Sequence, residues 1–98
     1  MNMQALMQQA QRMQREITKK KDELDKMEFS GKSEWVEMTF NGKKELVSFK
    51  ITKDGDISGE EKEILEDMIN IAMKDAFTKI DKETENKLGQ YASMSGLF

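Results

Sequence analysis

The sequence contains no cysteine and no histidine. Without cysteine, disulfide bonds and thiolate chemistry are excluded, and nothing indicates an oxidising compartment. Without histidine as well, one chain cannot assemble a Ser-His-Asp or Cys-His catalytic set, or a zinc site of the usual nitrogen and sulfur ligands. Carboxylates and lysines are the groups left for chemistry. We therefore expect no catalytic residue, no metal site and no cofactor.

Long apolar runs and aromatic residues are also scarce. No apolar run approaches the roughly 20 residues that span a bilayer, and glutamines interrupt the apolar residues near the N-terminus, so neither a membrane helix nor a signal peptide is expected. Charged residues make up 36% of the chain and aromatic residues 7%, which argues against a large core in a monomer. We expect one cytoplasmic domain, mostly helical, elongated and stabilised by dimerisation.

Residues 1–27 have the pattern of an amphipathic helix. Apolar residues recur at alternating steps of three and four, which defines a heptad seam that Lys20 alone interrupts. The seam consists of Met3, Leu6, Ala10, Met13, Ile17, Leu24 and Met27. Glutamine and methionine are good helix formers, so a helix is favoured over a flexible tail despite the low complexity.

Residues 28–52 change to a period of two, which predicts a small antiparallel sheet. A short strand is expected around residues 28–30, followed by a hairpin on Asn41 and Gly42, a pair typical of a two-residue type I′ turn. This turn predicts the opposed pairs Phe40–Lys43, Met38–Glu45 and Val36–Val47. Trp35 and Leu46 are then expected on the opposite face of the sheet.

A second long helix is predicted over residues 59–88. Ser58 and Glu61 resemble a capping box at its start. Its apolar positions form a face wide enough to contact both the sheet and another helix. They are Leu65, Met68, Ile69, Ala72, Met73, Ala76, Phe77 and Ile80, widened by Ile64 and Ile71. Residues 89–98 are expected to form a flexible tail.

The two helices have similar predicted lengths, about 40 to 45 Å each at 1.5 Å per residue. Equal lengths permit antiparallel pairing, with the start of the first helix beside the end of the second and the sheet at the opposite end.

Acidic residues near the start of the second helix resemble two kinds of site, a calcium loop and a set of carboxylates for acid-base chemistry. Residues 54–59, DGDISG, resemble the start of a calcium loop, but its twelfth position is Leu65 where a bidentate glutamate is required. We interpret the segment as a turn and helix cap. The acidic residues that follow lack a nearby histidine or pocket pattern, so a solvated helix start is favoured over acid-base chemistry.

Basic residues are concentrated in the first 21 positions. Five basic residues against one acidic residue give this segment a net charge of +4, which leaves −7 for the remainder of a chain whose net charge is −3. A basic helix on an acidic body can present phosphate-binding groups in one orientation. The candidate DNA-binding residues are Arg12, Arg15, Lys19, Lys20 and Lys21, with Lys79, Lys82 and Lys87 of the second helix. The alternative is a solvated helix face, as most charge runs are.

Three stretches, in order and spacing, resemble the signature stretches of the YbaB/EbfC family of bacterial nucleoid-associated proteins. They are ALMQQAQRMQREI, TFNGKKELVSFKI and EILEDMINIAMKDAFTKI. The resemblance spans nearly the whole chain. It implies an α+β fold of order α-β-β-β-α, in which long N- and C-terminal helices flank a small antiparallel sheet, and a homodimer whose helical arms project from the body.

The resemblance also implies a function. We expect a non-enzymatic, nucleoid-associated homodimer that binds double-stranded DNA with low or relaxed sequence specificity, through phosphate contacts from basic helix arms. No base-reading set is evident on the helices. The alternative is a protein-interaction or chaperone-like coiled-coil module, which would bind an apolar peptide with weak salt dependence.

Overall fold

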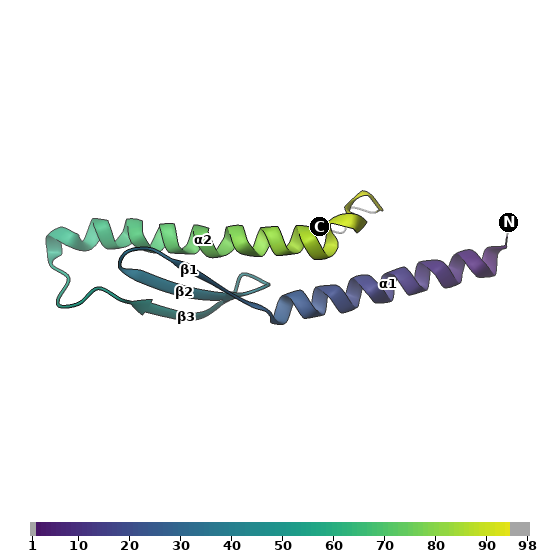
Figure 1. Cartoon of the computed structure of the whole chain (residues 1–98), viewed down its shortest axis with the longest axis horizontal. Coiled ribbons are helices and arrows are strands. Elements are labelled where there is room, and N and C mark those ends of the chain that lie inside the picture. The colour runs from purple at the N-terminus through teal and green to yellow at the C-terminus, as the bar shows by residue number, and fades with distance from the viewer. Residues whose placement is uncertain (1, 95–98) are drawn as a thin grey trace.

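The chain folds into two long helices and a three-stranded antiparallel sheet in the order α-β-β-β-α (Figure 1), which confirms the predicted fold class. The computed structural model describes residues 2–94. Its elements are α1 (Met3–Lys26), β1 (Glu28–Lys32), β2 (Val36–Asn41), β3 (Leu46–Ile51), the short 3-10 helix η1 (Gly59–Glu61), α2 (Lys62–Leu88) and the 3-10 helix η2 (Gly89–Met94). Residues 89–94 of the expected flexible tail thus form η2, and residues 95–98 lie outside the described residues.

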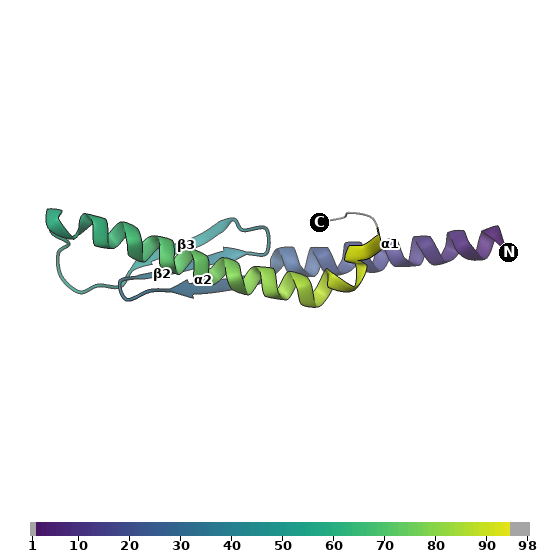
Figure 2. The same cartoon turned by 90° about the horizontal axis from the view of Figure 1, so that it is seen from above.

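The core lies between α2 and the sheet. Val36, Met38 and Phe40 alternate along β2 with half-buried polar residues and point toward α2. The eight apolar residues predicted to form the wide face of α2 all belong to this cluster; Ala72, Ala76 and Ile80 are its buried members. Seen from above, α2 lies across the sheet (Figure 2), and its contacts are with β1 and β2.

Gly31 of β1 lets the strand approach α2 closely. A Cβ atom at this position would overlap the carbonyl oxygen of Ala72 and lie 2.6 Å from the backbone nitrogen of Ala76. Both atoms belong to the helix backbone, which cannot move aside as a side chain can. The small residues at 31, 72 and 76 therefore determine how closely β1 and α2 pack.

The predicted register of the β2–β3 hairpin is wrong. Phe40 lies opposite Leu46, Met38 opposite Phe49 and Val36 opposite Ile51, with an irregularity between Thr39 and Phe40. The connection is a three-residue loop, because the backbone nitrogen of Asn41 donates to the Glu45 carbonyl at 3.0 Å. Leu46 accordingly faces the same side as Phe40, not the opposite side as predicted.

Two local interactions explain this longer loop. The Asn41 side-chain oxygen accepts hydrogen bonds from the backbone nitrogens of Lys43 and Glu45, at 2.9 and 3.0 Å. Lys44 takes the left-handed conformation, with φ of 65°, in place of Gly42. Gly42 instead provides space, since a Cβ there would overlap the backbone carbonyl of Leu24 at the end of α1.

Strand β3 is left uncovered by the rest of the described chain. It pairs with β2 along one edge, and α2 does not extend over it. Four apolar side chains on β3 remain 40 to 55% exposed, and we call them the β3 edge patch: Leu46, Val47, Phe49 and Ile51. An edge strand with free backbone groups and exposed apolar side chains is a site for pairing with another chain.

The two long helices are antiparallel but overlap only near one end of each, so the predicted full-length pairing is wrong. Ile17 and Leu24 of α1 pack against Leu88 of α2 and Tyr91 of η2. Most of α2 is occupied by the sheet, which leaves its C-terminal end for α1. The start of α1 therefore projects beyond η2 (Figure 1), and the molecule measures 70 × 20 × 15 Å.

Candidate nucleic-acid interface

Three of the predicted DNA-binding residues share one exposed face of α1. Arg12, Arg15 and Lys19 follow each other at steps of three and four, which places them on one side of the helix. This side points away from Ile17 and Leu24, whose side chains face α2 and η2. None of the three makes an ion pair with any residue in the described part of the chain.

Lys26 extends this face and was not among the residues predicted from the sequence. It follows Lys19 by seven residues, is exposed, and lines the same open depression along α1 as Arg15 and Lys19. Helical spacing was the signal available for it. We call Arg12, Arg15, Lys19 and Lys26 the outer basic face; it extends about 21 Å along the helix at 1.5 Å per residue.

Acidic residues also lie on or beside this face, and the structure pairs two of them. The Glu23 carboxylate lies 3.6 Å from the Lys87 ammonium of α2. The Glu16 carboxylate accepts a hydrogen bond from the Tyr91 hydroxyl at 3.4 Å. Asp22 lines the depression along α1. The basic character of the face is therefore strongest toward Arg12 and Arg15, where α1 leaves the body.

The three consecutive lysines of α1 point in different directions. Lys19 belongs to the outer basic face, whereas Lys20 is half-buried against η2. The Lys20 ammonium lies 5.2 Å from the centre of the Tyr91 ring and 3.4 Å from its hydroxyl oxygen. Lys21 lies 3.7 Å from Asp25, one helical turn further on. Lys20 interrupts the apolar seam, and its ammonium group lies over the Tyr91 ring. A cation–π interaction therefore accommodates the charge at this position.

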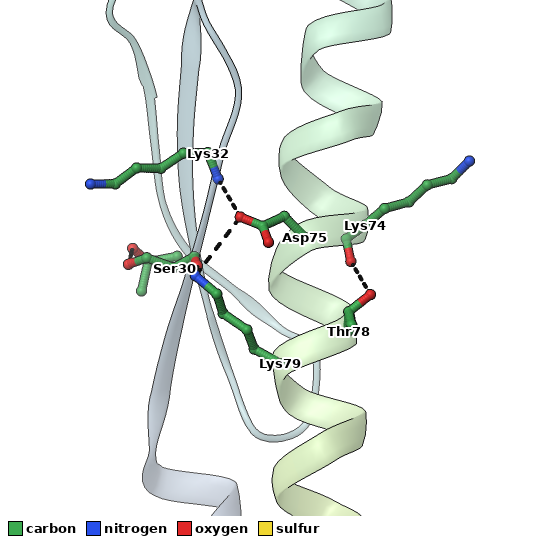
Figure 3. Close-up of polar contacts among 7 residues, drawn as sticks. Ser30, Lys32, Lys74, Asp75, Thr78 and Lys79 are labelled. Atoms are coloured by element: carbon green, nitrogen blue, oxygen red, sulfur yellow. Dashed lines mark hydrogen bonds and ion pairs between the residues drawn. The ribbon is translucent and has the colours of Figure 1, made fainter.

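The candidate lysines of α2 have separate environments. Lys79 donates a 2.6 Å hydrogen bond to the Ser30 carbonyl of β1 and lies 3.8 Å from Asp75 (Figure 3). Asp75 also accepts a 3.0 Å hydrogen bond from the backbone nitrogen of Lys32. Lys79 therefore joins α2 to β1 within the body, away from the basic segment of α1.

The other two candidate lysines of α2 lie closer to its C-terminal end. Lys87 reaches α1 through Glu23, and Lys82 is exposed. A role in DNA binding stays a prediction for all three lysines of α2.

The segment that imitates a calcium loop forms a helix cap. The Ser58 backbone nitrogen donates to the Glu61 carboxylate at 3.1 Å, and the two residues form the predicted capping box. The hydrogen bonds from Ser58 lower the pKa of Glu61, and the positive charge of Lys53, whose ammonium lies 3.4 Å away, lowers it further. Within residues 2–94, no three acidic residues gather as a metal site would require.

The same part of the chain, residues 2–94, contains no helix with both the length and the apolar character needed to cross a membrane.

Comparisons with known proteins identify a family, relatives and a protein of similar fold. The model of the YbaB/EbfC DNA-binding family matches residues 1–95. Two similar proteins are named nucleoid-associated proteins, SpyM50270 from Streptococcus pyogenes serotype M5 and SpyM3_1606 from serotype M3. Each is 42% identical over 94 residues, which is 94% of either chain. The fold resembles the crystal structure of the uncharacterized protein HP0035 from Helicobacter pylori. The TM-score is 0.76 at 23% identity, over 92% of this chain and 96% of that one.

Proposed function

Since the chain belongs to the YbaB/EbfC DNA-binding family, we propose that it is a nucleoid-associated homodimer that binds double-stranded DNA with low sequence specificity. The family is not a class of enzymes, and the chain lacks histidine and cysteine. The curated relatives are named for association with the nucleoid, and we extend that location to this protein.

The outer basic face carries this proposal. Cationic side chains along one exposed side of a helix can neutralise phosphates and release their counterions, which favours binding independently of sequence. Arg12, Arg15 and Lys19 are free of ion pairs within the described residues, so no internal pair has to be broken when they contact DNA. The guanidinium groups of Arg12 and Arg15 suit bidentate contacts with phosphate oxygens.

Dimerisation through the β3 edge patch would place two outer basic faces on one particle. The patch lies on an edge strand, so a second copy can extend the sheet or pack its own patch against it, and a two-fold axis makes such a surface self-complementary. Two basic faces held together bind more tightly than one, because the second contact is intramolecular.

The proposal is tested by titrating the protein into a random-sequence duplex at several salt concentrations. We expect the affinity to fall steeply with salt. A variant with Arg12, Arg15 and Lys19 changed to glutamine should reduce the log-log slope by about 0.9 for each phosphate that the protein no longer neutralises.

The matched control changes Lys32, Lys62 and Lys74 to glutamine, which removes the same charge from exposed positions on the body, away from β3. An equal loss of affinity in the control would mean that net charge, not the outer basic face, determines binding. Absence of binding by the unaltered protein at low salt would contradict the DNA-binding proposal and favour a protein-interaction module.

A further inference from the structure

The projecting start of α1 carries an apolar stripe that nothing in the described chain covers. Met3, Leu6 and Met7 are 69%, 42% and 59% exposed, and Ala10 is exposed beside them. The stripe continues the seam whose later members, Ile17 and Leu24, are buried against α2 and η2. We call residues 3–11 the arm tip. Its apolar residues are thus the unoccupied part of an interface that is occupied further along the same helix.

The arm tip differs from the rest of α1 in charge. Residues 3–11 contain no charged side chain, and its polar positions are glutamines. The tip therefore carries no charge to attract phosphate, in contrast to the outer basic face that follows it. An uncharged apolar stripe is also compatible with an identical stripe, because no like charges meet within it.

We infer that the arm tip is a self-association surface, on which the arm tip of a second copy packs in the antiparallel direction. If Leu6 of one copy lies opposite Met7 of the other, Met3 lies opposite Ala10, and every apolar residue of the stripe meets another apolar residue. The same contacts repeat on both sides of a two-fold axis, as a symmetric interface requires.

The shape of the molecule favours the antiparallel direction. Antiparallel pairing directs the two bodies away from each other, because the body lies at the other end of α1 (Figure 1). Parallel pairing would place the two bodies on the same side of the paired tips.

The contact is short, about two and a half helical turns, so a single pair of tips associates weakly. Many protein particles bound along DNA would present many tips at once, and weak contacts then add up. This step rests on the proposed function. Each DNA-bound dimer holds one duplex, and paired arm tips link two dimers, so that two DNA segments are joined.

Cysteine cross-linking of the full chain tests the pairing without DNA. Because the sequence has no cysteine, single introduced thiols give unambiguous disulfides. A mixture of Leu6→Cys and Met7→Cys proteins should form mixed cross-links under mild oxidation. A mixture of Ala5→Cys and Gln8→Cys proteins, which share the same register on the opposite side of the helix, should not. Equal yields from the two mixtures would overturn the inference.

A second experiment connects the pairing to DNA. The variant Leu6→Gln with Met7→Gln should keep its affinity for one short duplex but lose at least about tenfold in capture of a second duplex by DNA-bound protein. Burial of Leu and Met side chains accounts for more than that factor. Ala5→Gln, on the opposite side, serves as the control and should leave capture unchanged.

The two experiments separate the possible failures. Loss of affinity for the single duplex in the Leu6→Gln, Met7→Gln variant would mean that the stripe contacts DNA, and would overturn the inference. Cross-links without any DNA binding would support the pairing and contradict the proposed function.

Discussion

At the scale of single residues, the consecutive lysines of α1 illustrate how neighbours in sequence acquire different roles. Lys19 lies on the outer basic face, while Lys20 lies over the Tyr91 ring. We predict that Lys19→Gln lowers DNA affinity by roughly eightfold at 0.1 M salt, as a slope of 0.9 per phosphate contact implies. Lys20→Gln should lower it much less. Titration of both variants against one duplex measures the difference.

Equal effects of the two substitutions would show that Lys20 leaves Tyr91 to contact phosphate. The variant Tyr91→Phe provides a control, because it retains the ring beneath Lys20 and removes the hydroxyl that contacts Lys20 and Glu16.

The sequence alone could not assign these roles. Periodicity places Lys20 on the apolar seam, and that placement is correct, since Lys20 is half-buried. Its partner, however, is 71 positions away in a segment expected to be flexible. Contacts between distant segments depend on where the chain turns, and local pattern does not encode that.

At the scale of elements, the packing of β1 against α2 depends on Gly31. We predict that Gly31→Ala destabilises the fold by about 2 to 3 kcal/mol, in the range of overpacked core substitutions, because the added methyl group meets the helix backbone at Ala72 and Ala76. The thermal midpoint should fall by roughly 10 °C or more. Gly59→Ala is the control, since a Cβ there meets nothing within 4 Å. Similar thermal midpoints for the two variants would contradict this account.

The start of α2 should loosen in acid. The pKa of Glu61 is lowered from its ordinary value of 4.5, mainly by hydrogen bonds from Ser58. A carboxylate with a lowered pKa stabilises the fold above its ordinary value, and this contribution is lost as the pH falls through the lowered pKa. The protection factors of the backbone amides at residues 58–62 should therefore fall as the pH is lowered through that pKa.

Glu61→Gln is the matched variant for this prediction. Glutamine can retain the hydrogen bond from Ser58 in a capping box but does not titrate. The protection factors of its amides at residues 58–62 should depend less on pH than those of the unaltered protein. An unchanged pH dependence in the variant would assign the loosening to other carboxylates.

The elements themselves were largely predictable, and their junctions were not. Alternation along β2 and the wide apolar face of α2 indicated the residues that form the core. The predicted hairpin register is wrong because it assigns the positive φ to the Asn-Gly pair. In the structure Lys44 adopts it, and Gly42 is needed for contact with α1. A glycine in the sequence does not show whether it supplies a positive φ or leaves space for a neighbouring backbone.

At the scale of the whole molecule, the exposed edge of the sheet determines the proposed assembly. We predict that Phe49→Lys converts the proposed dimer into a monomer, because a charge in the middle of the β3 edge patch disfavours burial against a second copy. Light scattering after size-exclusion chromatography gives the mass. Ser48→Lys adds the same charge to the other face of β3 and should leave the dimer intact. A dimeric Phe49→Lys protein would place the interface elsewhere.

The elongated shape followed only in part from the sequence. Composition and the two long periodic segments indicated an extended molecule, and the length of 70 Å agrees with that. The sequence did not reveal that α1 and α2 overlap near one end only. Both α1 and the sheet compete for the apolar face of α2, and periodicity does not show which of them occupies each turn.

The position of Trp35 makes its fluorescence specific for one part of the molecule. It is the single tryptophan of the chain, it packs against the core between β2 and α2, and the Lys53 ammonium lies 5.3 Å from its ring. Residues 2–28, which include all of α1, contain no aromatic side chain. Fluorescence excited selectively at the tryptophan therefore reports the integrity of the body, and it excludes Tyr91, which packs against α1. A bound dye or introduced label then reports on α1, and the two signals can be recorded independently in one sample.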